Sequence, residues 1–366
     1  MHDTDLLKEA DRLMIVCNSC RYCEGLCAVF PAMELRRTFE QGDLDYLANL
    51  CHNCGACYTG CQFSPPHEFN VNVPLVLSGV RAESYARLAW PGACSRLFER
   101  NGLAISLVTT LGVALFILGF AAWNDPSVLF GVHRGAGAFY KLMPHNMMVV
   151  LFGGAFLYAM IAIGFGVRTL WRESGQNGSG VCSWRSVFQA MRDAATMRYL
   201  DGGGAGCVNG EDKPRDTRKL FHHFTSYGFL LCFAATSTAT LYHYLLGQEA
   251  PYPWYDLPVV LGTLGGIGLL IGPAGLLHAK WQRDPMIADT KRFGMDVAFL
   301  VMLFATSASG LALLVFRETS AMGMLLSIHL GIVFSLFMTM PYGKFVHGIY
   351  RFVALVRAAE ERRTLQ

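Results

Sequence analysis

The sequence has 366 residues, of which 53% are hydrophobic and only 16% are charged. These proportions exclude an ordinary soluble globular protein and point to membrane-spanning segments. The net charge of +3 is too small to favour nucleic acid as a partner. The polar N-terminus lacks the apolar stretch of a secretory signal, so we expect the N-terminal part, with most of the 12 cysteines, in the reducing cytoplasm.

Eight cysteines form two runs near the N-terminus, and each run reads C-x2-C-x2-C-x3-C. Bacterial ferredoxins hold two [4Fe–4S] clusters with this spacing, and the fourth cysteine of each run binds the cluster of the other run. Zinc sites more often have two separate C-x2-C arms. We therefore predict one cluster on Cys17, Cys20, Cys23 and Cys61, and a second on Cys51, Cys54, Cys57 and Cys27.

The segment between the runs, residues 32–50, lacks the alternating apolar pattern of a β-strand and favours two short helices. Pro91 and Gly92 follow a further predicted helix and mark a boundary. We predict a mainly α protein, with an α-helical ferredoxin-like domain at 1–95 and a transmembrane domain at 96–366.

The second part contains six apolar stretches of about the 20 residues that a membrane-spanning helix needs. The predicted spans are 103–123, 147–170, 222–246, 257–279, 295–316 and 323–349. A long connection at 171–220 separates the second span from the third.

Lys and Arg are distributed unequally between the two sets of connections. The segments 168–220 and 280–294 and the tail from 344 hold 18 of them, whereas the connections on the other side hold three. Because cytoplasmic loops are rich in Lys and Arg, this bias places the 1–95 domain and both termini in the cytoplasm.

Histidines recur at two depths of two predicted spans, and ionisable residues inside a membrane usually have a function. His222 and His243 lie near opposite ends of the third span, and His329 and His347 share one face of the sixth. Antiparallel spans would pair His222 with His347 at the inner level and His243 with His329 at the outer level. Each pair could supply two axial ligands to a haem b.

Single histidines at a membrane edge are more often interfacial residues than ligands, so other assignments stay open. His223 could replace His222, and His278 and His145 could replace a ligand or belong to a quinone site. The number of haems, one or two, is not fixed by the pattern.

Several specific stretches resemble the tricarballylate-utilisation protein B group, also called citrate-utilisation protein B. They are both cysteine runs, Pro65–Phe69, Arg198–Cys207, Phe221–Thr236 and Pro341–Phe352. The six-helix haem-b domain also resembles the gamma subunit of respiratory nitrate reductase, in which two haem histidines share one helix. In one respect the sequence departs from bacterial ferredoxins, because Ala28 and Gln62 stand where a proline follows the fourth cysteine.

The resemblance implies a multi-pass protein of the bacterial inner membrane that reoxidises the FADH2 of a partner flavoprotein, a tricarballylate dehydrogenase. Electrons would pass through the two clusters and haem b to quinone. The sequence contains no flavin or nucleotide fingerprint, so we expect no substrate site of its own. The alternatives are a membrane subunit of a heterodisulfide-reductase-like complex and a membrane redox sensor without turnover.

Overall fold

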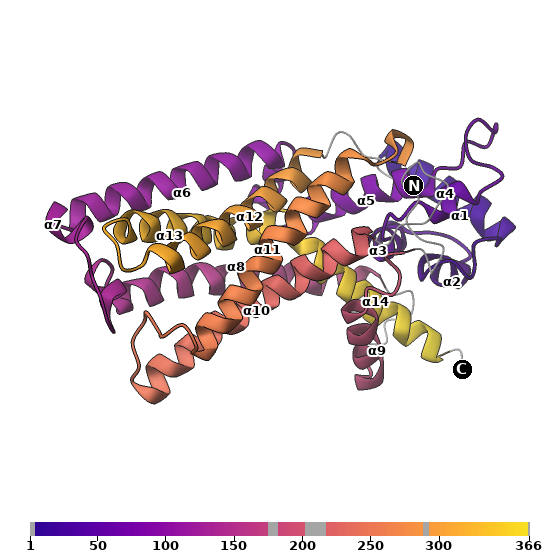
Figure 1. Ribbon diagram of the computed structural model, residues 1–366. Helices are drawn as coiled ribbons and strands as arrows, with labels where there is room; N and C mark the ends of the chain where they lie inside the picture. The colour runs from indigo at the N-terminus through magenta and orange to yellow at the C-terminus, as the bar shows by residue number, and fades with distance from the viewer. Residues whose placement is uncertain (1–3, 175–181, 202–216, 288–292, 365–366) are drawn as a thin grey trace.

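The computed structural model describes residues 4–174, 182–201, 217–287 and 293–364, and within these ranges the chain is helical without strands. The predicted mainly α fold is therefore confirmed. The N-terminal part is a group of short helices at one end of the molecule (Figure 1). Its helices are α1 (Asp5–Cys20), α2 (Val29–Glu34), α3 (Gln41–Leu50), α4 (Ala56–Thr59) and α5 (Val73–Arg87).

Side chains fix where these helices begin. The Thr4 hydroxyl accepts a hydrogen bond from the Leu7 amide at 3.2 Å and caps α1. The Asn72 side chain caps α5 in the same way. Such caps satisfy amide groups that have no partner inside the helix, and each contributes about 1 kcal/mol. The capped helix α1 leads into the first cysteine run, and the capped helix α5 follows the second run.

The core of the N-terminal part is completed by the C-terminal end of the chain. Leu13, Leu47 and Leu77 from α1, α3 and α5 are fully buried. Leu355 and neighbouring residues of α14 (Val346–Thr364) belong to the same buried cluster. Residues 1–95 are thus one sequence segment, but their hydrophobic core also includes a helix that follows the last span.

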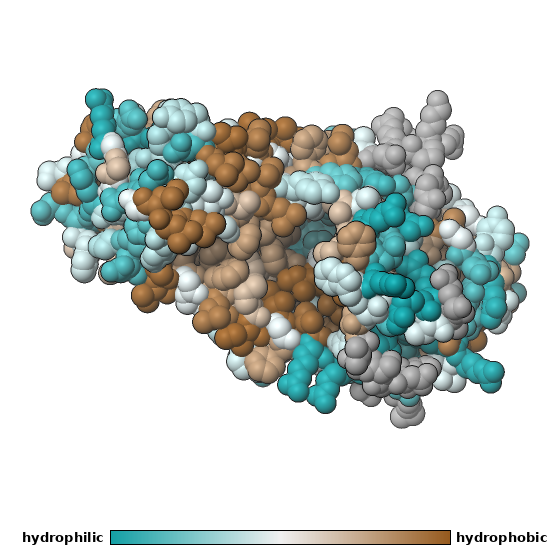
Figure 2. Space-filling view, turned by 90° about the horizontal axis from the view of Figure 1, so that it is seen from below, coloured by the Kyte–Doolittle hydropathy of each residue, from teal (hydrophilic) through white to brown (hydrophobic). Residues whose placement is uncertain are grey.

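Among the residues that the structure describes, six helices are long and apolar enough to cross a membrane, as predicted. They are α6 (Asn101–Trp123), α8 (His145–Glu173), α10 (Thr217–Leu246), α11 (Leu257–Trp281), α12 (Phe293–Phe316) and the segment Met322–Tyr342, which contains α13 (Met322–Thr339). On the face in Figure 2, apolar side chains gather over the middle of the molecule and polar ones toward both ends. This arrangement is typical of a membrane protein.

Shorter helices connect or flank the spans. They are η1 (Gly92–Phe98), α7 (Pro126–Leu129), η2 (Ala138–Lys141), α9 (Trp184–Ala195), η3 (Pro285–Ile287) and η5 (Met340–Tyr342). The glycine-rich part of the resemblance, up to Cys207, lies outside the described residues.

Glycines let two of the spans approach closely. A Cβ atom on Gly228 of α10 would lie 2.9 Å from the Gly265 carbonyl oxygen of α11. Small residues allow such backbone contact between membrane helices, where packing replaces the hydrophobic effect as the main attraction. The α10–α11 pair is therefore a tightly packed unit, and it lies across the other spans in Figure 1.

The predicted sixth span, 323–349, is not one continuous helix. Helix α13 ends at Thr339, a 3-10 turn follows, and His347 belongs to α14. Pro341 explains the break, because proline has no amide hydrogen to donate and its ring clashes with the preceding helical turn. The prediction that His329 and His347 share one face of one helix is therefore wrong.

Candidate metal centres

The first predicted set of cysteines lines one cavity. Cys17 and Cys20 lie in the last turn of α1, Cys23 lies in the loop after it, and Cys61 follows α4. The cavity is also lined by Val16, Phe30, Phe63 and Val71. Four thiols around an apolar hollow fit the donor set and surroundings of an iron–sulfur cluster.

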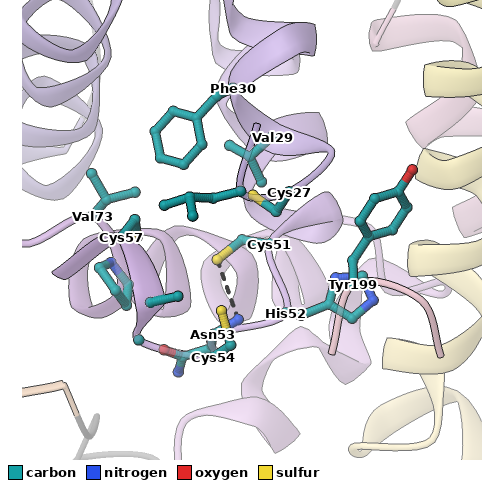
Figure 3. A pocket seen from close by; sticks show the side chains of 14 residues that line it. Cys27, Val29, Phe30, Cys51, His52, Asn53, Cys54, Cys57, Val73 and Tyr199 are labelled. Carbon is teal, nitrogen blue, oxygen red and sulfur yellow. Dashed lines mark hydrogen bonds between the residues drawn. The ribbon is translucent and has the colours of Figure 1, made fainter. Parts of the chain in front are cut away.

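The second predicted set lines another cavity, shown in Figure 3. Cys51 and Cys54 lie between α3 and α4, Cys57 is in α4, and Cys27 comes from the first run. Both cavities therefore combine three cysteines of one run with the fourth cysteine of the other. Within the described ranges, no three His, Cys, Asp or Glu side chains converge closely enough to hold one metal ion.

Burial and neighbouring thiols act together on the cysteines. Burial, together with the smaller effect of the nearby Cys23, Cys61 and Cys20, raises the pKa of Cys17 to about 12. Burial likewise raises the pKa of Cys57 well above its ordinary value, with Cys51, Cys27 and Cys54 adding to the effect. Without iron these thiols are neutral at pH 7, so cluster binding must release their protons.

The backbone of the 51–54 loop, residues Cys51 to Cys54, turns sharply around the second cavity. Asn53 has φ 51° and the next residue but one, Gly55, has φ 90°. Asn and Gly are the residues that adopt this left-handed region at low cost. The turn aims the Asn53 amide at the Cys51 sulfur, to which it donates a hydrogen bond of 3.4 Å (Figure 3).

Arginines from several helices hold the same loop by its carbonyl oxygens. The Cys51 carbonyl accepts from Arg81 of α5 at 2.6 Å and from Arg351 of α14 at 2.8 Å. Arg218 of α10 donates to the His52 carbonyl at 3.1 Å and to the Asn53 carbonyl at 3.0 Å. Arg283, just after α11, also donates to the Asn53 carbonyl, at 2.5 Å. The second cavity is thus docked against the start of α10 and the segment that follows α11.

Residues predicted for the inner haem lie beside this docking region. His222 and His347 are near enough to interact electrostatically, and Arg218, Arg351 and Lys344 act on His222 as well. The Nδ1 atom of His347 lies 2.6 Å from the Lys344 carbonyl oxygen, which fixes the orientation of its ring. The predicted inner pair is therefore within electrostatic range in the structure, although His347 comes from α14 and not from the last span.

The residues predicted for the outer haem have different neighbours. His243 stacks on His145, with ring centroids 3.7 Å apart, and the Nδ1 atoms of both rings are buried without a hydrogen bond. His329 instead lies 3.0 Å from the Ser309 hydroxyl of α12. These contacts favour His145, an alternative from the sequence, over His329 as the neighbour of His243.

Within the described residues, neither of the two remaining alternatives stacks on another histidine. His223 stacks on Tyr227 of its own helix, with ring centroids 5.6 Å apart. His278 is exposed near the inner end of α11.

Sequence reasoning missed His52 and the arginines around it. Burial lowers the pKa of His52 well below its ordinary value, and Arg351 lowers it further, so its ring is neutral at pH 7. Burial also lowers the pKa of Arg351, to about 10, and the charge of Arg81 adds to that effect. Arg351 still carries its charge at neutral pH. The signal in the sequence was that Arg218, Arg283 and Arg351 all lie in segments already counted as rich in Lys and Arg.

The fold and the site together define a class: an α-helical protein in which a ferredoxin-like cysteine domain is joined to six membrane-length helices. Comparison with known sequences identifies the family. The family profile "Citrate utilization protein B Fer4-like domain" matches residues 10–87, and "Citrate utilization protein B" matches residues 96–366. The chain belongs to the citrate utilization protein B family.

A curated relative supports this membership over nearly the whole length. The chain is 48% identical over 356 residues to the Escherichia coli protein "Citrate utilization protein B", and the match covers 97% of the chain and 92% of the relative. No solved structure matches the chain.

Proposed function

We propose that this protein carries electrons from a flavoprotein dehydrogenase through two [4Fe–4S] clusters and haem b to quinone in the bacterial inner membrane. The observation that carries the proposal is the position of the two cavities. The second cavity is held by Arg218, Arg283 and Arg351 against the membrane helices, beside His222 and His347. A carrier at that place would link the cytoplasmic domain to the membrane domain.

The first cavity offers the entry for electrons. Cys20 is exposed at its rim, and the adjacent Tyr22 has 75% of its surface exposed. A flavoprotein that docks on this rim could bring its flavin close to the first cluster. The family name and the Fer4-like match support a role in citrate or tricarballylate utilisation, so we propose an FAD-dependent tricarballylate dehydrogenase-like protein as the partner.

Clusters and haem, when bound, exchange one electron at a time and so divide the two electrons of a reduced flavin. The residues of the chain determine the distances between these cofactors and the environment of each one. Four cysteines would ligate each cluster, and His222 with His347 would hold the inner haem. His243 would hold the outer haem with His329, or with His145, on which it stacks in the structure. Apolar side chains, among them Val29 and Phe63, line much of both cavities.

The proposal is tested by mixing the purified protein in detergent with a reduced tricarballylate dehydrogenase-like flavoprotein. We expect reduction of the haem, followed by its reoxidation when a soluble quinone analogue is added. A protein that contains clusters but transfers no electrons to haem or quinone would refute the proposal.

A further inference from the structure

The two cavities differ in how strongly they are buried and in the charges around them. Cys51 of the second cavity is 7% exposed, whereas Cys20 of the first is exposed to solvent. An iron–sulfur cluster with four thiolates is negatively charged, and reduction adds one more negative charge. Burial disfavours that added charge. Burial alone would therefore make the second cluster harder to reduce than the first, which opposes electron flow toward the membrane.

Positive charge at the second cavity counteracts this effect. Arg81, Arg218, Arg283 and Arg351 all donate to carbonyl oxygens of residues 51–53, at distances of 2.5 to 3.1 Å. Arg81 is itself only 6% exposed, so solvent screens its charge weakly. Each guanidinium also neutralises the negative end of a carbonyl dipole beside a cluster ligand. The Asn53 amide adds a hydrogen bond to the Cys51 sulfur.

The first cavity has a corresponding contact that is much weaker. Arg21 donates to the Asn18 carbonyl at 3.1 Å, within the first cysteine run. Arg21 is exposed, and water and salt screen its charge. The same type of contact thus occurs at both cavities, but in different dielectric surroundings.

We propose that Arg81, Arg218, Arg283 and Arg351 raise the reduction potential of the second cluster above that of the first, so that electrons move toward the membrane. The four arginines come from α5, α10, the segment after α11 and α14. The arginines that dock the two parts of the protein against each other would therefore also set the direction of electron transfer. This inference rests on the proposed function, because it requires two clusters.

The test is a redox titration of both clusters by electron paramagnetic resonance in purified Arg351→Gln protein. Glutamine keeps hydrogen-bond donors but removes the charge. We expect the higher of the two reduction potentials to fall. At a fixed solution potential, the ratio of reduced to oxidised cluster should then drop roughly tenfold. The lower potential should stay unchanged. Arg21→Gln is the matched control and should leave both potentials where they are.

Two further variants distinguish an effect of the lost charge from a loss of the clusters themselves. Arg351→Lys retains the charge and should restore most of the higher potential, and Arg283→Gln replaces Arg351→Gln if that variant loses its clusters. Unchanged potentials in a variant with full iron and sulfide content would overturn the inference, as would a lysine variant that resembles the glutamine variant. Wild-type protein without two clusters by iron and sulfide analysis would instead overturn the proposed function.

Discussion

A buried ion-pair network ties the N-terminal part to the C-terminal helix, and its central residue is Arg36. Arg36 Nε lies 2.6 Å from Asp43 Oδ1, and Arg36 Nη2 lies 2.7 Å from Glu361 Oε1 of α14. The side chains of Arg36 and Asp43 are only 3% and 2% exposed. Burial by itself lowers the pKa of Arg36, but the hydrogen bond and charge of Glu361 outweigh it and the net pKa is raised.

We predict that Arg36→Ala strongly destabilises the protein. The substitution leaves the carboxylate of Asp43 buried without its partner, and breaking a buried pair in this way costs about 3–5 kcal/mol. For a protein of 366 residues that loss lowers the midpoint of thermal unfolding by about 4–7 °C, since the unfolding entropy grows with chain length. The assay is thermal unfolding of the purified protein in detergent, followed by loss of visible cluster absorbance.

Arg12→Ala is the matched control for this prediction. Arg12 pairs with Glu9 at 2.6 Å, but the two side chains are 42% and 36% exposed. Exposed pairs contribute about 0–1 kcal/mol, so the control should change the midpoint by no more than about 1 °C. The reasoning about burial is refuted if Arg36→Ala lowers the midpoint no further than Arg12→Ala does.

Three further predictions address the clusters, the haem and the pH dependence. Cys27→Ser should alter the same cluster signal as Cys57→Ser, and Cys61→Ser the same signal as Cys17→Ser. If Cys27→Ser altered the same signal as Cys17→Ser, cross-ligation would be contradicted. His347→Ala should remove a low-spin haem signal, whereas the exposed His278→Ala should not, and equal haem spectra would exclude His347 as a ligand. Burial raises the pKa of Asp45 to about 6, with the charge of Arg87 opposing it, so protonated Asp45 stabilises the fold below about pH 4. That stability, about 3 kcal/mol, is lost as the pH rises through 6. Asp45→Asn should therefore flatten the fall of the thermal midpoint between pH 4 and 7, and a fall as steep as in the wild type would count against this assignment.

Sequence reasoning worked where local spacing decides the outcome. The cysteine runs predicted which thiols share a cavity, because a tight loop can wrap one cluster with three ligands only. Hydropathy found six spans because the membrane requires long apolar helices. It failed at Pro341, where an apolar pattern continues through a helix break.

Contacts between distant segments were beyond prediction. Arg81, Arg218, Arg283 and Arg351 bind backbone carbonyl oxygens, and a carbonyl gives no signal in the sequence to mark it as a partner. The contact of His243 with His145 depends on the tilt of α10 relative to α8, which helical periodicity does not determine. Periodicity gives the face of a helix but not its neighbour.

The contribution of α14 to the N-terminal core has a consequence for biosynthesis. Leu355 and its neighbours leave the ribosome roughly 300 residues after the second cysteine run, yet they belong to the same buried cluster as Leu13 and Leu47. The hydrophobic core around the cysteine loops is therefore completed only after all six spans have been synthesised. We expect a chain arrested before α14 to lack this part of the core and to retain no stable cluster.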